Sequence, residues 1–591
     1  MDTLWQDVRL SIRRLRKAPL FSTVAIISIA LGIGANTAVF SLLDQALLRA
    51  LPVKDPSRLV WLSASGPRSG WINSNYSGEV TFTYPSYRDF RDGGAAAFDG
   101  VLARTQVALS AAWHGQTDRI SGEIVSGNYF EVLGANALIG RTLSQDDDRT
   151  PGAHPVVVLD YGYWRSRFGA DRSVLNQTVI LNSHPMTIVG VMPPGFHGVG
   201  TTERPFAYVP MMMRSEMFPG RKDLEDRKAY WLNIFARLKP GVSFKQAEAS
   251  MNTFWRPILE EEVKAFPNMS AKNRENFTNR QLQMVSAESG ISAAPDEFGP
   301  AMGILMAMVT VLLLIACANV ANLMIARGTS RQKEIAIYLA LGASRWRLFR
   351  QVMVESVVLS LTGGMFGILL AVWLGDFILS MLPMDPSSQM VTAQPDLRIM
   401  LFTIALSVLT GLIFGLAPAL QATQFNVSTM LKEQAAGVMG GRSHMRLRKT
   451  LVVAQVALSL TLLIGAGLFA YSLRNLKNIP AGFRTDHLIS FSVQPQLNAY
   501  TPEKMRALYN QMEQNLATIS GVQGVVAVNT QLLAGDNSRR SRFRATPRTK
   551  ARTWPQARTG SPQAISASSA FRCWPAATSP CKTMLLRPES L

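Results

Sequence analysis

Residues 301–326 form an uncharged apolar run that ends abruptly at a basic segment, residues 327–350. As an α-helix this run is long enough to cross the hydrocarbon core of a bilayer, which is about 30 Å thick and requires about 20 residues. The segment that follows carries six Lys or Arg residues and has the pattern of a basic amphipathic surface helix. The junction predicts a membrane helix that presents a loop to a partner in the cytoplasm.

Five segments of the chain meet the length and charge criteria for membrane helices. They lie at about residues 20–43, 301–326, 356–382, 399–421 and 450–472. A chain with five such segments is expected to be an integral membrane protein that lies in the lipid bilayer.

Lys and Arg residues cluster in three segments next to these spans, residues 1–19, 327–350 and 422–449. The positive-inside rule places all three in the cytoplasm, so that the N-terminus is inside. Residues 44–300 and the chain from residue 473 onward are then outside. A cleaved signal peptide is the alternative for the first span, but its apolar stretch is longer than a typical h-region, which favours a signal anchor.

Residues 44–300 have the composition of a soluble domain and are numerous enough to form a core of their own. Short runs rich in β-branched residues, such as residues 155–159 and 186–191, predict strands. Ser243 followed by Gln246 predicts a capping box at the start of a helix. We therefore expect an α-helical membrane protein with an α+β domain on the outer side of the membrane, between its first and second spans.

The chain also contains an internal repeat. The sequence Arg-Leu-Arg-Lys precedes the first span at residues 14–17 and the fifth span at residues 446–449. A strand-like segment follows each of these two spans, and Thr501 and Pro502 in the second copy are suited to the start of a helix. The pattern predicts a duplicated unit in which residues 473–536 begin a second domain on the outer side of the membrane.

The sequence offers little catalytic or ligand-binding chemistry. It contains no Gly-x-x-x-x-Gly-Lys-Ser/Thr motif, so an ATPase that acts with it is expected to be a separate chain. Its six histidines are isolated and its three cysteines form no zinc-binding pattern, so we expect no metal, no cofactor and no catalytic residue. The basic residues cluster beside the spans and in the C-terminal tail without interleaved aromatic residues, which argues against a nucleic-acid partner.

Three sets of residues carry a resemblance to a known family. They are Leu15–Phe21 with Leu31–Phe40, Val125–Gly134 with Gly140 and Arg141, and Cys317–Asn322 with Arg331–Ile335 and Leu341–Ser344. Through these motifs, residues 1 to about 535 resemble MacB/FtsX-type ABC transporter permeases, most closely the acidobacterial duplicated orphan permeases. The resemblance implies an inner-membrane protein with one helix, a MacB-like periplasmic core domain and an FtsX-like unit of three helices at 301–421.

The resemblance also implies that the loop between the second and third spans contacts a cytoplasmic ABC ATPase. We expect an amphipathic helix there whose role is docking and not catalysis. The residues expected to make the contact are Arg331, Lys333, Glu334, Ile335, Leu341, Gly342 and Ala343. An interfacial helix that lies on lipid is the alternative. Tyr338 departs from the family pattern, which usually has Arg or Lys, so one charged contact is expected to be missing. A homodimer and a periplasmic partner are compatible with the resemblance.

The tail, residues 537–591, differs from the rest of the chain. It carries eleven Lys or Arg residues and one acidic residue, Glu589, and it lacks apolar periodicity. This composition predicts either a disordered basic arm or the product of a frameshift or truncation, because a duplicated family member would continue with the rest of the second domain and three more helices. We expect no packed domain in this tail.

The expected function is that of a permease subunit, which couples ATP hydrolysis by a partner to movement of periplasmic domains in efflux or extraction. A non-transporting signalling or scaffold protein that activates a periplasmic partner is the alternative, and it would use the same helices and loop. A secondary transporter is disfavoured because its spans would carry buried charges, which are scarce here.

Overall fold

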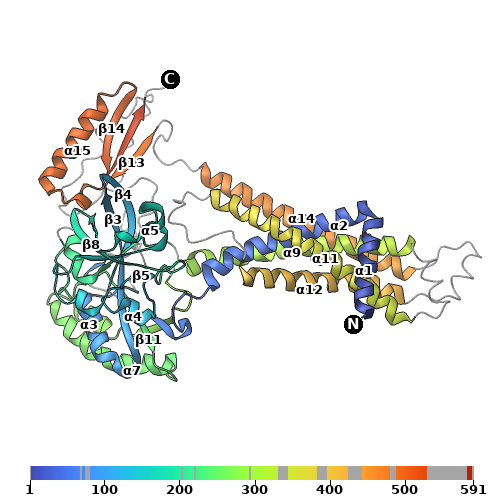
Figure 1. Cartoon of the computed structure of the whole chain (residues 1–591), viewed down its shortest axis with the longest axis horizontal. Helices are drawn as coiled ribbons and strands as arrows, with labels where there is room; N and C mark the ends of the chain where they lie inside the picture. Colours follow the sequence, from blue (N-terminus) through green and yellow to red (C-terminus); the bar gives the residue numbers. More distant parts are fainter. Residues whose placement is uncertain are drawn as a thin grey trace, which may run out of the picture.

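The computed structural model describes residues 2–66, 70–72, 80–200, 204–218, 221–291, 294–330, 344–381, 396–423, 442–478, 488–528 and 582–588. In this part of the chain, a sheet-rich domain lies at one end of an elongated molecule and a bundle of long helices forms the other end (Figure 1). A smaller module, residues 488–528 with 582–588, lies beside the sheet-rich domain. We call the end of the bundle remote from the sheet-rich domain the distal end.

Five helices are long and apolar enough to cross a membrane, judged by length and composition. They are α2 (Pro19–Leu43), α9 (Ala294–Ser330), α11 (Arg345–Met381), α12 (Leu397–Thr423) and α14 (Arg442–Lys477). The five expected spans are confirmed. The structure differs in the basic segment, because α9 continues to Ser330 and α11 already begins at Arg345. Basic residues on both sides of residues 331–343 therefore belong to helices that continue out of the apolar spans.

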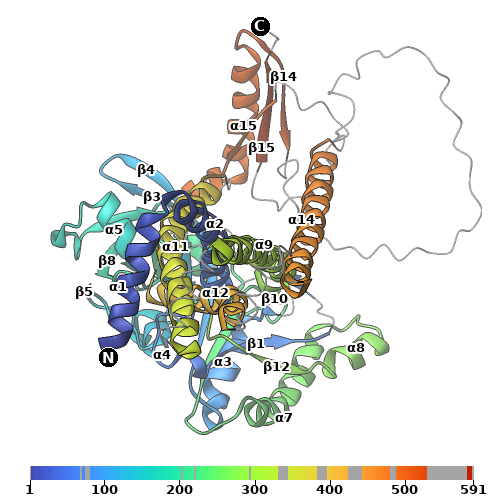
Figure 2. The same cartoon turned by 90° about the vertical axis from the view of Figure 1, so that its right-hand side faces the viewer.

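Helix α2 lies inside the bundle and contacts α9, α11 and α12 (Figure 2). Small residues permit a close approach to α11: a Cβ added to Gly34 would lie 2.9 Å from the carbonyl oxygen of Gly367. Ile29 and Ile33 of α2 are fully buried in the core that these helices share. Helix α14 contacts α9, but no residue in its most apolar stretch is buried by the rest of the described chain. In a membrane, lipid would cover that surface.

Two neighbouring polar residues join α2 to two other helices. The side-chain amide of Asn36 donates a hydrogen bond to the carbonyl oxygen of Val309 on α9 at 2.8 Å. The hydroxyl of Thr37 lies 3.1 Å from that of Thr403 on α12. Asn36 and Thr37 are 2% and 1% exposed, so both contacts lie where water cannot replace them.

The sheet-rich domain is built on a ten-stranded sheet, with the order β12-β1-β11-β3-β4-β9-β6-β8-β5 and with β7 paired to β3 and β8. Its strands are β1 (Leu59–Ala64), β3 (Phe98–Trp113), β4 (Gln116–Val125), β5 (Ile139–Gly140), β6 (Val156–Leu159), β7 (Thr178–Leu181), β8 (His184–Val191), β9 (Ala207–Pro210), β11 (Asn233–Leu238) and β12 (Leu282–Ser286). A separate parallel pair consists of β2 (Trp71–Ile72) and β10 (Ala229–Tyr230). Both expected strands, 155–159 and 186–191, lie in this sheet as β6 and β8.

Helices cover this sheet and complete two apolar cores. They are α3 (Tyr84–Gly93), α4 (Tyr129–Leu133), α5 (Tyr161–Arg167), α6 (Arg214–Met217), α7 (Phe244–Glu262) and α8 (Ala271–Thr278). The predicted capping box at the start of α7 is confirmed, because the Ser243 amide donates to Gln246 Oε1 at 3.1 Å and the Gln246 amide donates to Ser243 Oγ at 3.4 Å. The expected α+β class is also confirmed.

A buried ion pair fixes the centre of the sheet. Arg104 Nη1 on β3 lies 3.0 Å from Glu123 Oε1 on β4, and the two side chains are 1% and 3% exposed. The Tyr129 hydroxyl donates to the other oxygen of Glu123 at 3.1 Å. Burial raises the pKa of Glu123, which Arg104 opposes, and burial also holds the pKa of Tyr129 well above its usual value. Tyr129 therefore remains a protonated donor.

Backbone hydrogen bonds hold the two segments that connect the bundle to the sheet-rich domain. The Leu51 amide, shortly after α2, donates to the carbonyl oxygen of Glu288 at 2.7 Å. The Ile291 amide, just before α9, donates to the carbonyl oxygen of Val199 at 2.8 Å. The chain therefore enters and leaves this domain at neighbouring points, so movement of α2 or α9 acts on the same part of the sheet-rich domain.

The smaller module consists of β13 (Ile489–Val493), α15 (Pro502–Ala517), β14 (Val522–Val528) and β15 (Lys582–Pro588), and its sheet order is β13-β15-β14. The expected helix start is confirmed, because Thr501 Oγ1 accepts from the Lys504 amide at 3.4 Å. Strand β15 departs from the expectation of a disordered tail, since residues 582–586 pair with β13 and residues 583–588 pair with β14. Residues 529–581 and 589–591 lie outside the described residues, so the rest of that expectation stays a prediction.

Candidate functional site

The distal end of the bundle brings three helices together: α1 (Asp2–Lys17), α9 and α11. Helix α1 lies across the bundle axis there, near the N-terminus (Figure 1). The break between α1 and α2 falls at Ala18 and Pro19, because proline cannot continue the hydrogen bonding of the preceding helix. A separate, strongly amphipathic helix with three basic residues in its last turn results, which suits a membrane surface.

Glu355 on α11 is the charged residue that joins these helices. Its side chain is 8% exposed, and its two oxygens lie 4.0 Å from Arg14 Nη1 on α1 and 3.4 Å from Arg327 Nη1 on α9. One buried carboxylate thus faces two arginines from two other helices. We call these three residues the Glu355 hub.

Arg327 adds two further contacts to this hub. Its Nη2 donates to the backbone carbonyl of Arg14 at 3.2 Å, so the contact with α1 includes the main chain. Its guanidinium also lies over the ring of Phe21 at 4.6 Å, which is within cation–π range. Because Arg327 stands near the end of α9, these contacts fix the helix end to the junction of α1 and α2.

A second ion pair lies beside the hub. Arg350 Nη2 on α11 lies 2.8 Å from Asp7 Oδ2 on α1, and the Asp7 side chain is 10% exposed. The Arg350 Nε also donates to the same oxygen at 2.8 Å. Helix α1 is therefore held to α11 at two points, one on each side of its middle turns.

Two charged pairs lie near the opposite end of the bundle and link α2 to α12. Asp44 Oδ1 lies 3.9 Å from Arg398 Nη1, and Arg49 Nη2 lies 3.7 Å from Asp396 Oδ2. Asp44 begins the short π-helical turn Asp44–Leu48 that follows α2. The Arg49 and Arg398 side chains are more exposed than the arginines at the distal end, so these pairs hold α2 and α12 less firmly.

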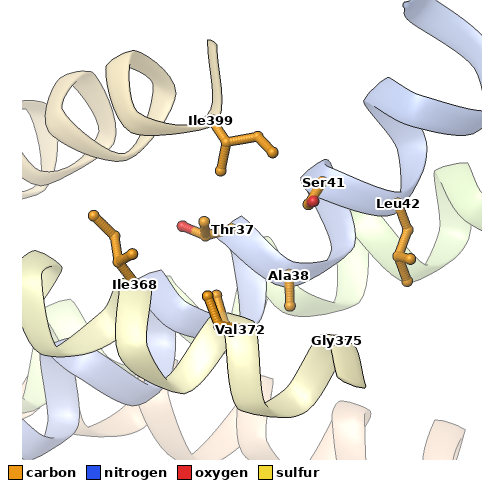
Figure 3. A pocket seen from close by; sticks show the side chains of 9 residues that line it. Thr37, Ala38, Ser41, Leu42, Ile368, Val372, Gly375 and Ile399 are labelled. Atoms are coloured by element: carbon orange, nitrogen blue, oxygen red, sulfur yellow. The ribbon is translucent and has the colours of Figure 1, made fainter. Parts of the chain in front are cut away.

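A small pocket near these pairs lies between α2, α11 and α12 (Figure 3). Its lining is mostly aliphatic, with the hydroxyls of Thr37 and Ser41 as the polar groups and no charged side chain. Such a lining fits helix packing better than recognition of a charged substrate.

The seven expected docking residues lie within residues 331–343, outside the described residues. The structure describes the two helix ends that flank them, Ser330 and Arg345, with Ser344 between the loop and α11. The Glu355 hub is the part of this site that the sequence did not predict. A carboxylate at the edge of an apolar span, with arginines at the ends of two other spans, is the signal that could have found it.

The two parts of this chain match two known domain families. The MacB-like periplasmic core domain matches residues 22–254, and the FtsX-like permease C-terminal domain matches residues 306–427. The chain belongs to the MacB/FtsX type of ABC permease. This permease is a multi-pass protein of the inner membrane with a periplasmic domain, and its assignment to the duplicated subgroup stays a prediction.

Curated relatives of this permease are similar over part of their length. The macrolide export ATP-binding/permease protein MacB of Burkholderia cenocepacia is 24% identical over 307 residues, which cover 51% of this chain and 40% of the relative. MacB of Campylobacter jejuni is 25% identical over 415 residues, which cover 68% of this chain and 56% of the relative. The permease therefore spans about two fifths to just over half the length of these two relatives.

Among solved structures, the periplasmic region of MacB from Actinobacillus actinomycetemcomitans is 16% identical and covers 40% of this permease and 91% of that chain, with a TM-score of 0.28.

Proposed function

We propose that this chain is the permease subunit of an ABC-type transporter, and that a separate ATPase in the cytoplasm drives it. The relatives are named for macrolide export, which supports efflux as the activity. The observation that carries the proposal is the Glu355 hub, because it ties three helices together at the base of the loop that would meet the ATPase. The distal end is accordingly assigned to the cytoplasm.

The contacts of the described residues supply a path for force. A displacement of residues 331–343 acts first on the adjoining ends of α9 and α11. Glu355 passes it to α1, and the short Ala18–Pro19 connection passes it to α2, where Ser22 Oγ donates to the Leu15 carbonyl at 2.8 Å. Helices α2 and α9 then enter the periplasmic domain at neighbouring points. The periplasmic domain would move as a consequence, outside the lipid core.

In this proposal the loop residues make the ATPase contact. As an amphipathic helix, residues 331–341 would place Ile335 and Leu339 in an apolar groove of the ATPase, while Lys333 and Glu334 would set the register through charge. Arg331, Leu341, Gly342 and Ala343 would complete the contact. A lipid-surface helix would need the same apolar residues but no particular order of the two opposite charges.

Reversing those charges tests the docking role. The double variant Lys333→Glu with Glu334→Lys keeps the net charge of the loop and is expected to abolish co-purification of the ATPase with an affinity-tagged chain. The chain offers a matched control at Lys432 and Glu433, the same dipeptide in the connection between the fourth and fifth spans, and its reversal should leave co-purification unchanged. Equal co-purification by both variants would favour the lipid-surface role.

The assignment of the two sides has its own test. Reporter fusions at Gly169 and Asp396 should be periplasmic, and a fusion at Ser344 should be cytoplasmic, because Lys and Arg residues concentrate on the Ser344 side. The measurement is paired alkaline phosphatase and fluorescent-protein activity at each position. A cytoplasmic result at Gly169 would contradict the arrangement.

Two further members of the assembly follow from the same proposal, a second copy of the chain and a periplasmic partner. Co-purification of two differently tagged copies from one membrane tests the first. Periplasmic cross-linking to the sheet-rich domain, followed by mass spectrometry, tests the second.

A further inference from the structure

The smaller module repeats the first elements of the sheet-rich domain. In both, a strand leads to a helix that begins after a threonine cap and has proline in its first turn, and a second strand follows. The threonines are Thr83 before α3 and Thr501 before α15. Apart from the two-residue β2, which pairs with β10 outside the large sheet, the order makes β13 correspond to β1, α15 to α3, and β14 to β3.

In the sheet-rich domain, β1 and β3 are not neighbours in the sheet. Strand β11 lies between them and is antiparallel to both. Against β3, Arg237 pairs with Gly100, and the register shifts before Leu238, which pairs with Phe98. The strand that joins the two halves of this repeat therefore comes from a distant part of the sequence.

In the smaller module, β15 occupies the corresponding place. It lies between β13 and β14 and is antiparallel to both. Against β14, Arg587 pairs with Gly524, and the register shifts before Pro588, which pairs with Val522. An arginine opposite a glycine, followed by the same shift of one residue, is repeated in both sheets.

We propose that the place between β13 and β14 is a strand-acceptor site, and that the C-terminal segment of this same chain, residues 582–588, fills it in place of a β11-like strand. Without such a strand, β13 and β14 would each expose an unpaired edge. Recognition by main-chain hydrogen bonds tolerates a wide range of side chains, which explains how a segment from a basic tail can occupy the site. This inference does not rest on the proposed transport function.

Cysteine pairs in the full-length chain test the register. Directly opposite residues in an antiparallel pair have Cα atoms about 5 Å apart, which a disulfide can bridge, whereas diagonal pairs lie about 7–8 Å apart. The direct pairs are Phe491 with Met584 and Ile489 with Leu586. The matched diagonal pairs, Phe491 with Leu586 and Ile489 with Met584, use the same four positions. Cys573→Ser and Cys581→Ser remove the competing thiols of the tail.

Both direct pairs are expected to give at least about tenfold more intramolecular cross-link than both diagonal pairs under mild oxidation in membranes. Equal yields from direct and diagonal pairs, or no cross-link in any of them, would overturn the proposal. A cross-link that joins two chains and migrates as a dimer would show that a second copy fills the site, and would overturn the assignment to the same chain.

A second measurement separates loss of the strand from a general effect on the tail. Leu585→Pro removes an amide from the middle of β15, where each amide of a central strand serves one neighbour or the other. Proteolysis of residues 488–528 in the full-length chain should become at least about tenfold faster. Ala567→Pro, in the same tail but outside the described strand, should leave that rate unchanged. Equal rates for the two variants would contradict the strand-acceptor site.

Discussion

Replacing Glu355 by alanine is expected to release α1 from the distal ends of α9 and α11. The substitution leaves Arg14 and Arg327 facing one another without their shared carboxylate. Breaking a buried ion pair costs about 3–5 kcal/mol, and we expect about 3 kcal/mol because Arg14 is a quarter exposed and can turn toward water. Hydrogen exchange of residues 2–17 should accelerate by about 100-fold in a chain reconstituted in lipid, which corresponds to that free energy.

The control for this variant is Arg347→Ala, on the same helix but with an exposed side chain. It also removes one charge next to the loop and should leave exchange in α1 unchanged. Glu355→Gln should lie between the two, because the amide oxygen can still accept one hydrogen bond but carries no charge. If exchange in α1 were the same for Glu355→Ala and Arg347→Ala, the hub would not hold the helices together. Stimulation of the partner's ATPase activity by the same variants then shows whether the Glu355 hub takes part in coupling ATP hydrolysis to helix movement.

The membrane part of the fold was predictable because it depends on local properties. The length and hydropathy of each span, with the distribution of Lys and Arg, identify five helices without knowledge of tertiary contacts. The same information does not show which helices contact one another or through which residues. Asn36 and Thr37 hold α2 to α9 and α12 through partners more than 270 residues away in sequence.

The sheet-rich domain was predictable in class but not in topology. Strands such as β6 and the capping box of α7 follow from short patterns. The strand order does not, because β1 lies between β11 and β12, which come much later in the chain. The Arg104–Glu123 pair could not be predicted for the same reason. Charged residues within strands are expected to be exposed unless their neighbours in the sheet are known.

For the candidate site, the sequence predicted the docking loop but not the Glu355 hub that lies next to it. The family motifs direct attention to residues 331–343, which lie outside the described residues. Glu355 belongs to no motif, and its importance depends on the meeting of three helix ends. The C-terminal strand was missed for another reason, because composition and periodicity do not report on pairing by the main chain.

Replacing Gly34 by leucine is expected to separate α2 from α11 and to destabilise the whole bundle. A Cβ at this position would already lie 2.9 Å from the Gly367 carbonyl oxygen and 3.1 Å from a Leu370 methyl group. Both helix backbones are in contact there, so the added side chain cannot be accommodated by a change of rotamer alone. Overpacking of a core costs about 1–3 kcal/mol, and we expect the upper end of that range or more. The measurement is the fraction of chain that remains monodisperse in mild detergent after heating.

Gly465→Leu provides the matched control, since it places the same side chain on the apolar helix α14 where a Cβ would meet nothing within 4 Å. It should behave like the parent chain. Gly34→Ala combined with Leu370→Ala then separates two causes of the defect. If the clash with the Leu370 side chain dominates, this double variant should be as stable as the parent chain. If the approach of the two backbones dominates, as the position of the Gly367 oxygen predicts, the pair should remain less stable than the single variant Leu370→Ala.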